Sequence, residues 1–190
     1  MKKKGLLIGI VAVVVAIILV VGGLVSTYNS LVDKEAEVIN TNAQIQVQLQ
    51  RRADLIPNLV STVKGYAAHE EEIYTALADA RAKLNSASNT DEYTEAIESY
   101  DSALSRLLVV VENYPELKAN ENFVYLMDEL SGTENRISTA RKDYNDAATE
   151  YNKAIKKFPA AIFAGMFGFD KADVFEASAV AQDVPTVSFE

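Results

Sequence analysis

Residues 5–25 read GLLIGIVAVVVAIILVVGGLV, a run of 21 residues without a charged side chain, and Lys2, Lys3 and Lys4 precede it. As a helix the run would be roughly 31 Å long, close to the hydrocarbon thickness of a bilayer. A helix also satisfies its own backbone hydrogen bonds, as lipid requires. The run is longer than the apolar core of a signal peptide, and no A-x-A-like cleavage site follows it. We therefore predict a basic N-terminus over residues 1–4 and an uncleaved transmembrane helix over residues 5–25.

Charge is distributed unevenly around this run. The chain has 18 Lys and Arg and 27 Asp and Glu, and three of the basic residues but none of the acidic ones precede the run. The part beyond it therefore has 15 basic and 27 acidic residues, a net charge of −12. So acidic a domain is not expected to bind nucleic acid. Because positive residues stay inside, the three lysines predict a cytoplasmic N-terminus and a domain on the extracytoplasmic side of the bacterial membrane.

Apolar residues beyond the run recur with helical periodicity. Leu31, Val38 and Ile45 are seven residues apart, as are Tyr93, Tyr100 and Leu107. These coiled-coil-like rows predict helices over residues 26–50, 55–84, 91–112 and 120–157. The expected fold is all-α, with the transmembrane helix followed by an antiparallel four-helix bundle over residues 26–159.

Residues 160–190 are expected to lie outside the bundle helices. The stretch 160–169, AAIFAGMFGF, is apolar but too short to span a membrane. We expect it to cover the end of the bundle, and contact with the membrane is the less favoured alternative. A short helical patch after residue 170 and a short extended tail from Val184 are expected to complete the chain.

The join between the first two predicted helices rests on Pro57. A proline in a helix interior removes one hydrogen bond and kinks the chain. Asp54 could cap a new helix whose first turn would contain Pro57. We therefore favour a turn at residues 51–54. The alternative is one long helix kinked at Pro57, because the apolar row Ala53, Ile56, Val60 and Val63 continues in phase through the proline.

The motifs of the common catalytic and metal sites are missing from the sequence. There is no cysteine, and His69 is the single histidine. A di-iron site in a helical bundle needs two Glu-x-x-His motifs. Neither a P-loop nor a G-x-G-x-x-G or G-x-S-x-G motif occurs. We therefore predict no catalytic residues, no metal, no cofactor and no enzymatic activity.

Four charged residues lie on or beside the apolar rows: Arg52, Glu70, Glu134 and Arg141. In one interpretation they form buried or half-buried ion pairs that fix the register of the helices. In the other they line a polar pocket for a small molecule or a peptide. The sequence does not separate the two.

Several motifs resemble those of the LemA family. They are RRADLIPNLV at residues 51–60, ENYP at residues 112–115 and the pairs Glu134-Asn135 and Tyr144-Asn145. The resemblance covers nearly the whole chain. It implies a single-span bacterial membrane protein with a helical-bundle domain and no established catalytic activity, linked in some members to a membrane zinc metalloprotease. Some descriptions of the family place the short N-terminus outside, opposite to the lysine argument.

We expect a membrane-anchored, non-enzymatic scaffold or adaptor of the cell envelope. Residues 5–25 would contact lipid, and the domain would bind envelope proteins, a membrane metalloprotease among the candidates, or assemble into a homo-oligomer. The alternative function is an envelope sensor with a small-molecule or peptide pocket in the bundle. The candidate interaction residues are those of the family motifs and the apolar rows: Arg51, Arg52, Asp54, Pro57, Asn58, Lys64, Glu70, Arg81, Glu112, Tyr114, Pro115, Glu134, Asn135, Arg141, Tyr144 and Asn145.

Overall fold

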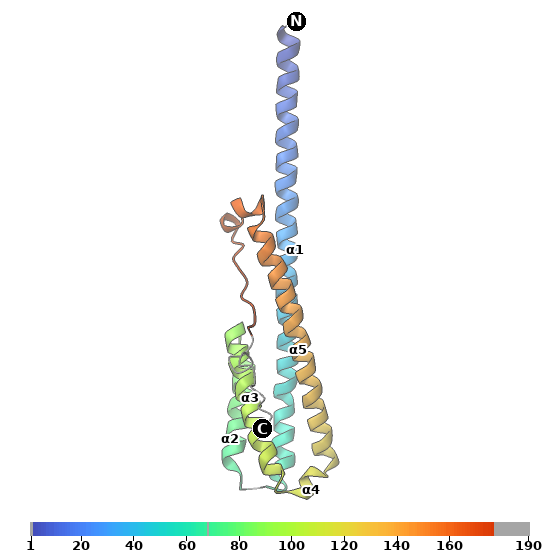
Figure 1. Cartoon of the computed structure of the whole chain (residues 1–190), viewed down its shortest axis with the longest axis vertical. Helices are drawn as coiled ribbons and strands as arrows, with labels where there is room; N and C mark the ends of the chain where they lie inside the picture. The colour runs from blue at the N-terminus through green and yellow to red at the C-terminus, as the bar shows by residue number, and fades with distance from the viewer. Residues whose placement is uncertain (1, 68, 177–190) are drawn as a thin grey trace, which may run out of the picture. The chain divides into compact units, whose positions relative to one another are not determined.

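The structure is a computed structural model that describes residues 2–67 and 69–176. Over these residues the chain is helical and contains no strand, which confirms the all-α class. The helices are α1 (Lys2–Lys64), α2 (Glu71–Ser86), α3 (Thr90–Val111), α4 (Pro115–Lys118) and α5 (Glu121–Lys156), followed by the 3-10 turns η1 (Ala160–Ile162) and η2 (Gly165–Phe167) (Figure 1).

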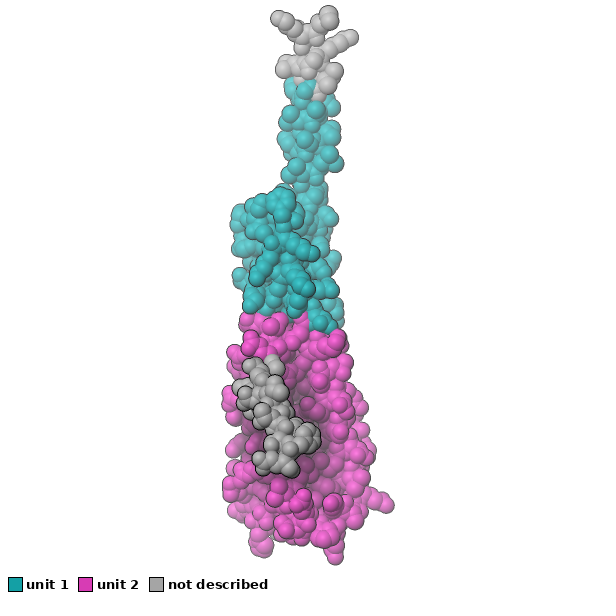
Figure 2. Space-filling model, in the orientation of Figure 1, with its two compact units in different colours: residues 1–41, 146–172 teal, residues 42–145, 173–190 magenta. Residues whose placement is uncertain are grey.

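The chain divides into two compact units, coloured separately in Figure 2. Unit 1 contains residues 1–41 and 146–172, and unit 2 contains residues 42–145 and 173–190. The first part of α1 and the last part of α5 therefore belong to unit 1. The remaining parts of both helices belong to unit 2, together with α2, α3 and α4.

Unit 2 has a core formed by buried side chains of α1, α2, α3 and α5, together with Leu117 of α4. Fully burying one large apolar side chain contributes about 1.5–3 kcal/mol, so rows of them at helical spacing hold the segments together. The predicted rows on α3 are found in the core: Tyr93, Tyr100 and Leu107 are almost wholly buried. The other large buried residues include Ile45, Leu49, Ile56, Leu59 and Val63 of α1, Leu77 of α2 and Leu130 and Ile137 of α5.

Unit 1 has a smaller core made by α1, α5 and the chain that follows α5. Leu31 of α1 packs with Tyr151 and Ile155 of α5. Ala160, Phe163, Ala164 and Phe169 complete this cluster, so part of the apolar stretch 160–169 is buried within unit 1. Residues 170–176 have no regular secondary structure, so the helical patch predicted after residue 170 is wrong for these residues. The predicted extended tail lies outside the described residues.

The predicted turn at residues 51–54 is wrong, because α1 continues without a break from Lys2 to Lys64 and contains Pro57. The first join falls instead at residues 65–70. Asp54 caps no helix, and its carboxylate accepts a hydrogen bond from Gln50 Nε2 at 2.8 Å. The alternative of one long helix is therefore correct in that α1 is continuous through Pro57.

A side chain from α2 explains why the helix survives its proline. Pro57 has no amide hydrogen, so the carbonyl of Ala53, four residues earlier, loses its helical donor. Arg81 Nε donates a hydrogen bond to this carbonyl, with an N···O distance of 3.2 Å. Since Ala53 is wholly buried, an unsatisfied carbonyl there would cost about 1–3 kcal/mol. The guanidinium of Arg81 therefore takes the place of the missing amide.

Substitutions at Pro57 and Arg81 should be coupled. Arg81→Met removes the donor to the Ala53 carbonyl and should destabilise the protein by about 1–2 kcal/mol. In a Pro57→Ala background the new amide can bond this carbonyl, so Arg81→Met should cost about 1 kcal/mol less. The measurement is a double-mutant cycle from urea unfolding of the full-length protein in detergent micelles.

Arg106→Met is the matched control, because Arg106 pairs with Glu72 on the exposed surface of unit 2 and does not contact the proline turn. Its effect should be the same with and without Pro57. Strict additivity of Pro57→Ala and Arg81→Met would show that Arg81 does not replace the missing amide.

Candidate functional site

Arg52 is the buried charge at the centre of unit 2. Its side chain comes from α1 and only 2% of the residue is exposed. Its Nη2 forms an ion pair with the Glu134 carboxylate of α5 and lies 3.6 Å from Asp101 Oδ1 of α3. Its guanidinium carbon lies 4.3 Å from the ring centre of Tyr100, also on α3. Through this one side chain, three helices of unit 2 are joined by charge and by a cation–π contact.

The two carboxylates at Arg52 differ in how closely they pair with the cation and in how strongly burial disfavours their ionised form. Both are about half exposed. Partial burial, reinforced by Glu134 and Glu98 and opposed by Arg52, raises the pKa of Asp101 above its ordinary value. Burial likewise raises the pKa of the Tyr100 phenol, with Arg52 acting in the opposite direction. Glu134 is thus the close partner of the cation, whereas Asp101 is a distant one that is itself penalised when ionised.

The interior of this cluster is only partly satisfied. Within the described part of the chain, Arg52 Nε and Nη1 and the Tyr100 hydroxyl are buried without a hydrogen-bond partner. Buried polar groups of this kind are uncommon and costly. Burying this cluster therefore costs free energy of desolvation. The contact with Glu134 has to offset the part of this cost that comes from the guanidinium.

The other two charged residues of the apolar rows lie elsewhere. Glu70 does not sit on a helical row between Val63 and Leu77, because the join at residues 65–70 puts those residues on different helices. Its carbonyl instead accepts hydrogen bonds from the amides of Ile73 and Tyr74 at the start of α2. Arg141 lies over the ring of Phe175, at 4.7 Å from the ring centre. Of the four charges, the structure brings together Arg52 and Glu134.

The remaining motif residues of α1 act at its surface and near its end. Arg51 pairs with Glu129 of α5 at 2.8 Å. The exposed Asn58 accepts a hydrogen bond from the Thr62 hydroxyl at its carbonyl. The Lys64 ammonium lies 4.9 Å from the ring centre of Tyr74, which belongs to α2. The contacts of Arg51 and Lys64 connect α1 to its neighbours in unit 2.

The ENYP motif makes the connection between α3 and α5. Glu112 is exposed at the end of α3, and Pro115 is the first residue of α4, where a missing amide costs nothing. The carbonyl of Tyr114 accepts hydrogen bonds from the amides of Leu117 and Lys118. Asn135 of the other motif pair does not belong to this connection and lies exposed on α5. The motif residues around α4 therefore shape a turn.

Tyr144 and Asn145 hold the backbone of residues 173–175 within unit 2. The Tyr144 hydroxyl donates to the carbonyl of Asp173 at 2.8 Å. The Asn145 amide group donates to the carbonyl of Phe175 at 2.9 Å and accepts from its amide at 2.8 Å. The ring of Phe175 packs on Tyr93 and Tyr144, with centroid distances of 6.3 and 5.4 Å. The Asn145 side chain thus bonds both main-chain groups of one residue, as a neighbouring strand would.

Sequence reasoning missed Phe175 as a partner of these residues. The signal available was a single large aromatic residue in the stretch 171–176. The same device recurs inside unit 1, where Asn152 makes two hydrogen bonds with the backbone of Ala172, at 2.7 and 2.9 Å. The asparagines of the repeated Tyr-Asn pairs of α5 are therefore backbone clamps.

The described residues define an all-α protein with a long apolar helix at its N-terminus. From Gly9 onward, α1 contains a stretch that is long and apolar enough to cross a membrane, and none of that stretch is buried. In the described ranges, no group of three or more His, Asp or Glu side chains is placed to hold a metal ion. The model of the LemA family matches residues 41–189, and the chain belongs to this family.

Curated relatives carry two kinds of name. The chain is 28% identical to magnetosome protein MamQ 2 of Paramagnetospirillum magneticum and 26% identical to magnetosome protein MamQ of Magnetospirillum gryphiswaldense; each alignment covers 92% of this chain and 74% of the relative. It is 29% identical to protein LemA of Metamycoplasma hominis, over 83% of this chain and 73% of that protein. None of these names describes an enzyme.

Removing the charge of either carboxylate at Arg52 should affect the stability of the protein differently. Glu134→Gln leaves a buried guanidinium without its close counter-charge, so it should destabilise the protein by about 2–4 kcal/mol at pH 7. Asp101→Asn removes a carboxylate whose pKa is raised in the folded state, so it should leave stability unchanged or raise it. The measurement is the free energy of unfolding of each full-length variant in detergent micelles.

The pH dependence provides the control. A carboxyl with a raised folded-state pKa is penalised above that pKa, and the penalty disappears as the pH falls through it. The difference in stability between Asp101→Asn and the parent protein should therefore shrink on acidification. Equal losses from the two substitutions at pH 7 would contradict the assigned roles.

Proposed function

We propose that this protein is a non-enzymatic scaffold or adaptor of the bacterial envelope. The anchor confines it to a membrane, and unit 2 presents a surface to another membrane protein or to a second copy of the chain. A membrane metalloprotease is one candidate partner, suggested by the resemblance described above. Nucleic acid is not among the expected partners, because the domain is acidic.

The observation that carries this proposal is a group of exposed apolar side chains on either side of α4. Val109, in the last turn of α3, is 65% exposed, and Tyr125, near the start of α5, is 63% exposed. Val124 and Leu108 beside them are also exposed. Single exposed apolar residues are ordinary, but several next to one turn favour a protein contact. Figure 1 shows that α4 connects the two helix ends that carry them.

The closed state of the Arg52 cluster supports a scaffold more than a sensor. A sensor of the expected kind would place Arg52, Glu70, Glu134 and Arg141 around one open polar pocket. Arg52 is instead paired with Glu134 inside unit 2. Glu70 serves the start of α2, and Arg141 covers Phe175. These contacts stabilise the fold, so we expect a partner to be recognised by other residues, at the surface of the domain.

Site-specific photo-crosslinking tests the surface. A benzophenone amino acid would replace Tyr125 or Val109 in the full-length protein in its native membrane, and exposed Ser138 of α5 would serve as the control position. We expect a discrete adduct from positions 125 and 109 and none from 138. Adducts of twice the chain's mass would identify self-assembly. The same adducts from all three positions, or none from 125 and 109, would contradict the proposal.

We also propose that the domain lies on the extracytoplasmic side, on the strength of the three lysines before the span. The chain has no cysteine, so Ser138→Cys supplies a single reactive thiol on exposed α5. A membrane-impermeant maleimide should label it fully in intact spheroplasts. Labelling that requires permeabilisation would place the domain in the cytoplasm and reverse the orientation.

A further inference from the structure

The chain after α5 turns large apolar side chains outward. Phe158 and Met166 are 82% and 83% exposed, and Ile162 and Phe167 are 69% and 59% exposed. Phe163 and Phe169 of the same stretch are buried in the core of unit 1. Gly168, with a φ of +78°, turns the chain so that it returns to that core. The segment 158–167 therefore has one face on its own unit, which includes Phe167, and an outward face formed by the largely exposed side chains of Phe158, Ile162 and Met166.

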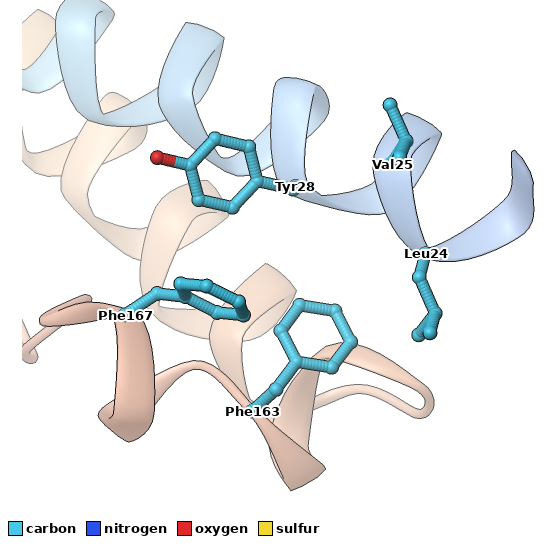
Figure 3. A pocket seen from close by; sticks show the side chains of 5 residues that line it. All are labelled: Leu24, Val25, Tyr28, Phe163 and Phe167. Atoms are coloured by element: carbon cyan, nitrogen blue, oxygen red, sulfur yellow. The ribbon is translucent and has the colours of Figure 1, made fainter. Parts of the chain in front are cut away.

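This segment lies beside the point where the apolar span ends. Phe163 and Phe167 face Leu24, Val25 and Tyr28 of α1 across a hollow of about 290 Å³, shown in Figure 3. The Tyr28 ring meets Phe167 edge to face at a centroid distance of 5.2 Å. Leu24 and Val25 end the apolar run of residues 5–25. The outward face thus begins beside the end of that run.

The charge around the segment differs from that of the rest of the domain. Residues 153–171 contain Lys153, Lys156, Lys157 and Lys171 but Asp170 as their one acidic residue, whereas the domain as a whole has more acidic than basic residues. Lys153 and Lys157 line a second hollow of about 560 Å³ beside Phe158. Its other charged lining residues are Lys34 and Glu150, which form an ion pair, and its α1 side includes Ser26, Thr27, Ser30 and Leu31. Ammonium groups thus accompany the exposed phenyl ring just beyond the span.

We propose that residues 158–167 are a second membrane contact, in which the outward side chains enter the interface of the bilayer that α1 spans. Aromatic residues are favoured at this depth, and lysines can keep their charge among the lipid phosphates while apolar neighbours reach inward. The occupant of the exposed face is lipid because the face continues the exposed apolar surface of Leu24 and Val25, at the end of the helix that would cross the membrane. The membrane anchor then has two parts, the spanning part of α1 and an aromatic segment that lies in the interface.

The absence of tryptophan from the chain makes the test direct. Phe158→Trp and Met166→Trp each place one fluorophore on the outward face of the full-length protein. Ile39→Trp is the control, because Ile39 is 65% exposed in unit 1 but 14 residues beyond Val25 on α1. Each variant is reconstituted in vesicles of phosphatidylcholine and phosphatidylglycerol with brominated acyl chains.

Brominated chains should quench the fluorophores at positions 158 and 166 at least about threefold more than the control, and acrylamide should quench the control more. Replacing Lys153, Lys156 and Lys157 by Gln should lower the quenching of the fluorophore at position 158 in phosphatidylglycerol vesicles and leave it unchanged in pure phosphatidylcholine. Acrylamide quenching equal to that of the control would overturn the proposal. Shielding from both quenchers would also overturn it and would indicate a protein occupant, such as a second copy.

Discussion

The buried guanidinium of Arg52 links three helices of unit 2 and constrains how they pack. A cation on α1 is withdrawn from water, so its counter-charge has to come from the helices that cover it. Glu134 on α5 supplies that charge, and Tyr100 on α3 supplies an aromatic face. Rotating any of the three helices would break one of these contacts. Apolar rows bring the helices together, whereas this cation determines which faces meet.

The backbone of α1 adds a second constraint, and it marks the limit of what sequence could reveal. Helical periodicity correctly predicted the row through Ala53, Ile56 and Val63, which are all buried. Local rules then placed a turn before Pro57, because proline removes a donor that a helix interior needs. The replacement donor is Arg81, 28 residues away from Ala53 and on another helix. The error at Glu70 followed from the same cause, since the true join lies directly before α2.

Local sequence patterns also did not predict which side chains of the C-terminal segments are buried and which are exposed. Residues 160–169 read as one uniformly apolar stretch, yet its phenylalanines divide between the core and the exterior of unit 1. Burial of Phe175 depends on Tyr93 and Tyr144, which are distant in sequence. The closure of the Arg52–Glu134 pair could be named as one of two possibilities, because both residues lie on or beside apolar rows, but periodicity does not report pairing.

The asparagine clamp in unit 2 recognises main-chain atoms, and this has a consequence for how the protein can change over generations. Asn145 bonds the amide and carbonyl of residue 175, and the Tyr144 hydroxyl bonds the carbonyl of residue 173. The side chain of the intervening Val174 takes no part in these hydrogen bonds. Point substitution at that position leaves these hydrogen bonds unchanged. Loss or gain of one residue would shift the aromatic ring out of register, so selection acts here on length.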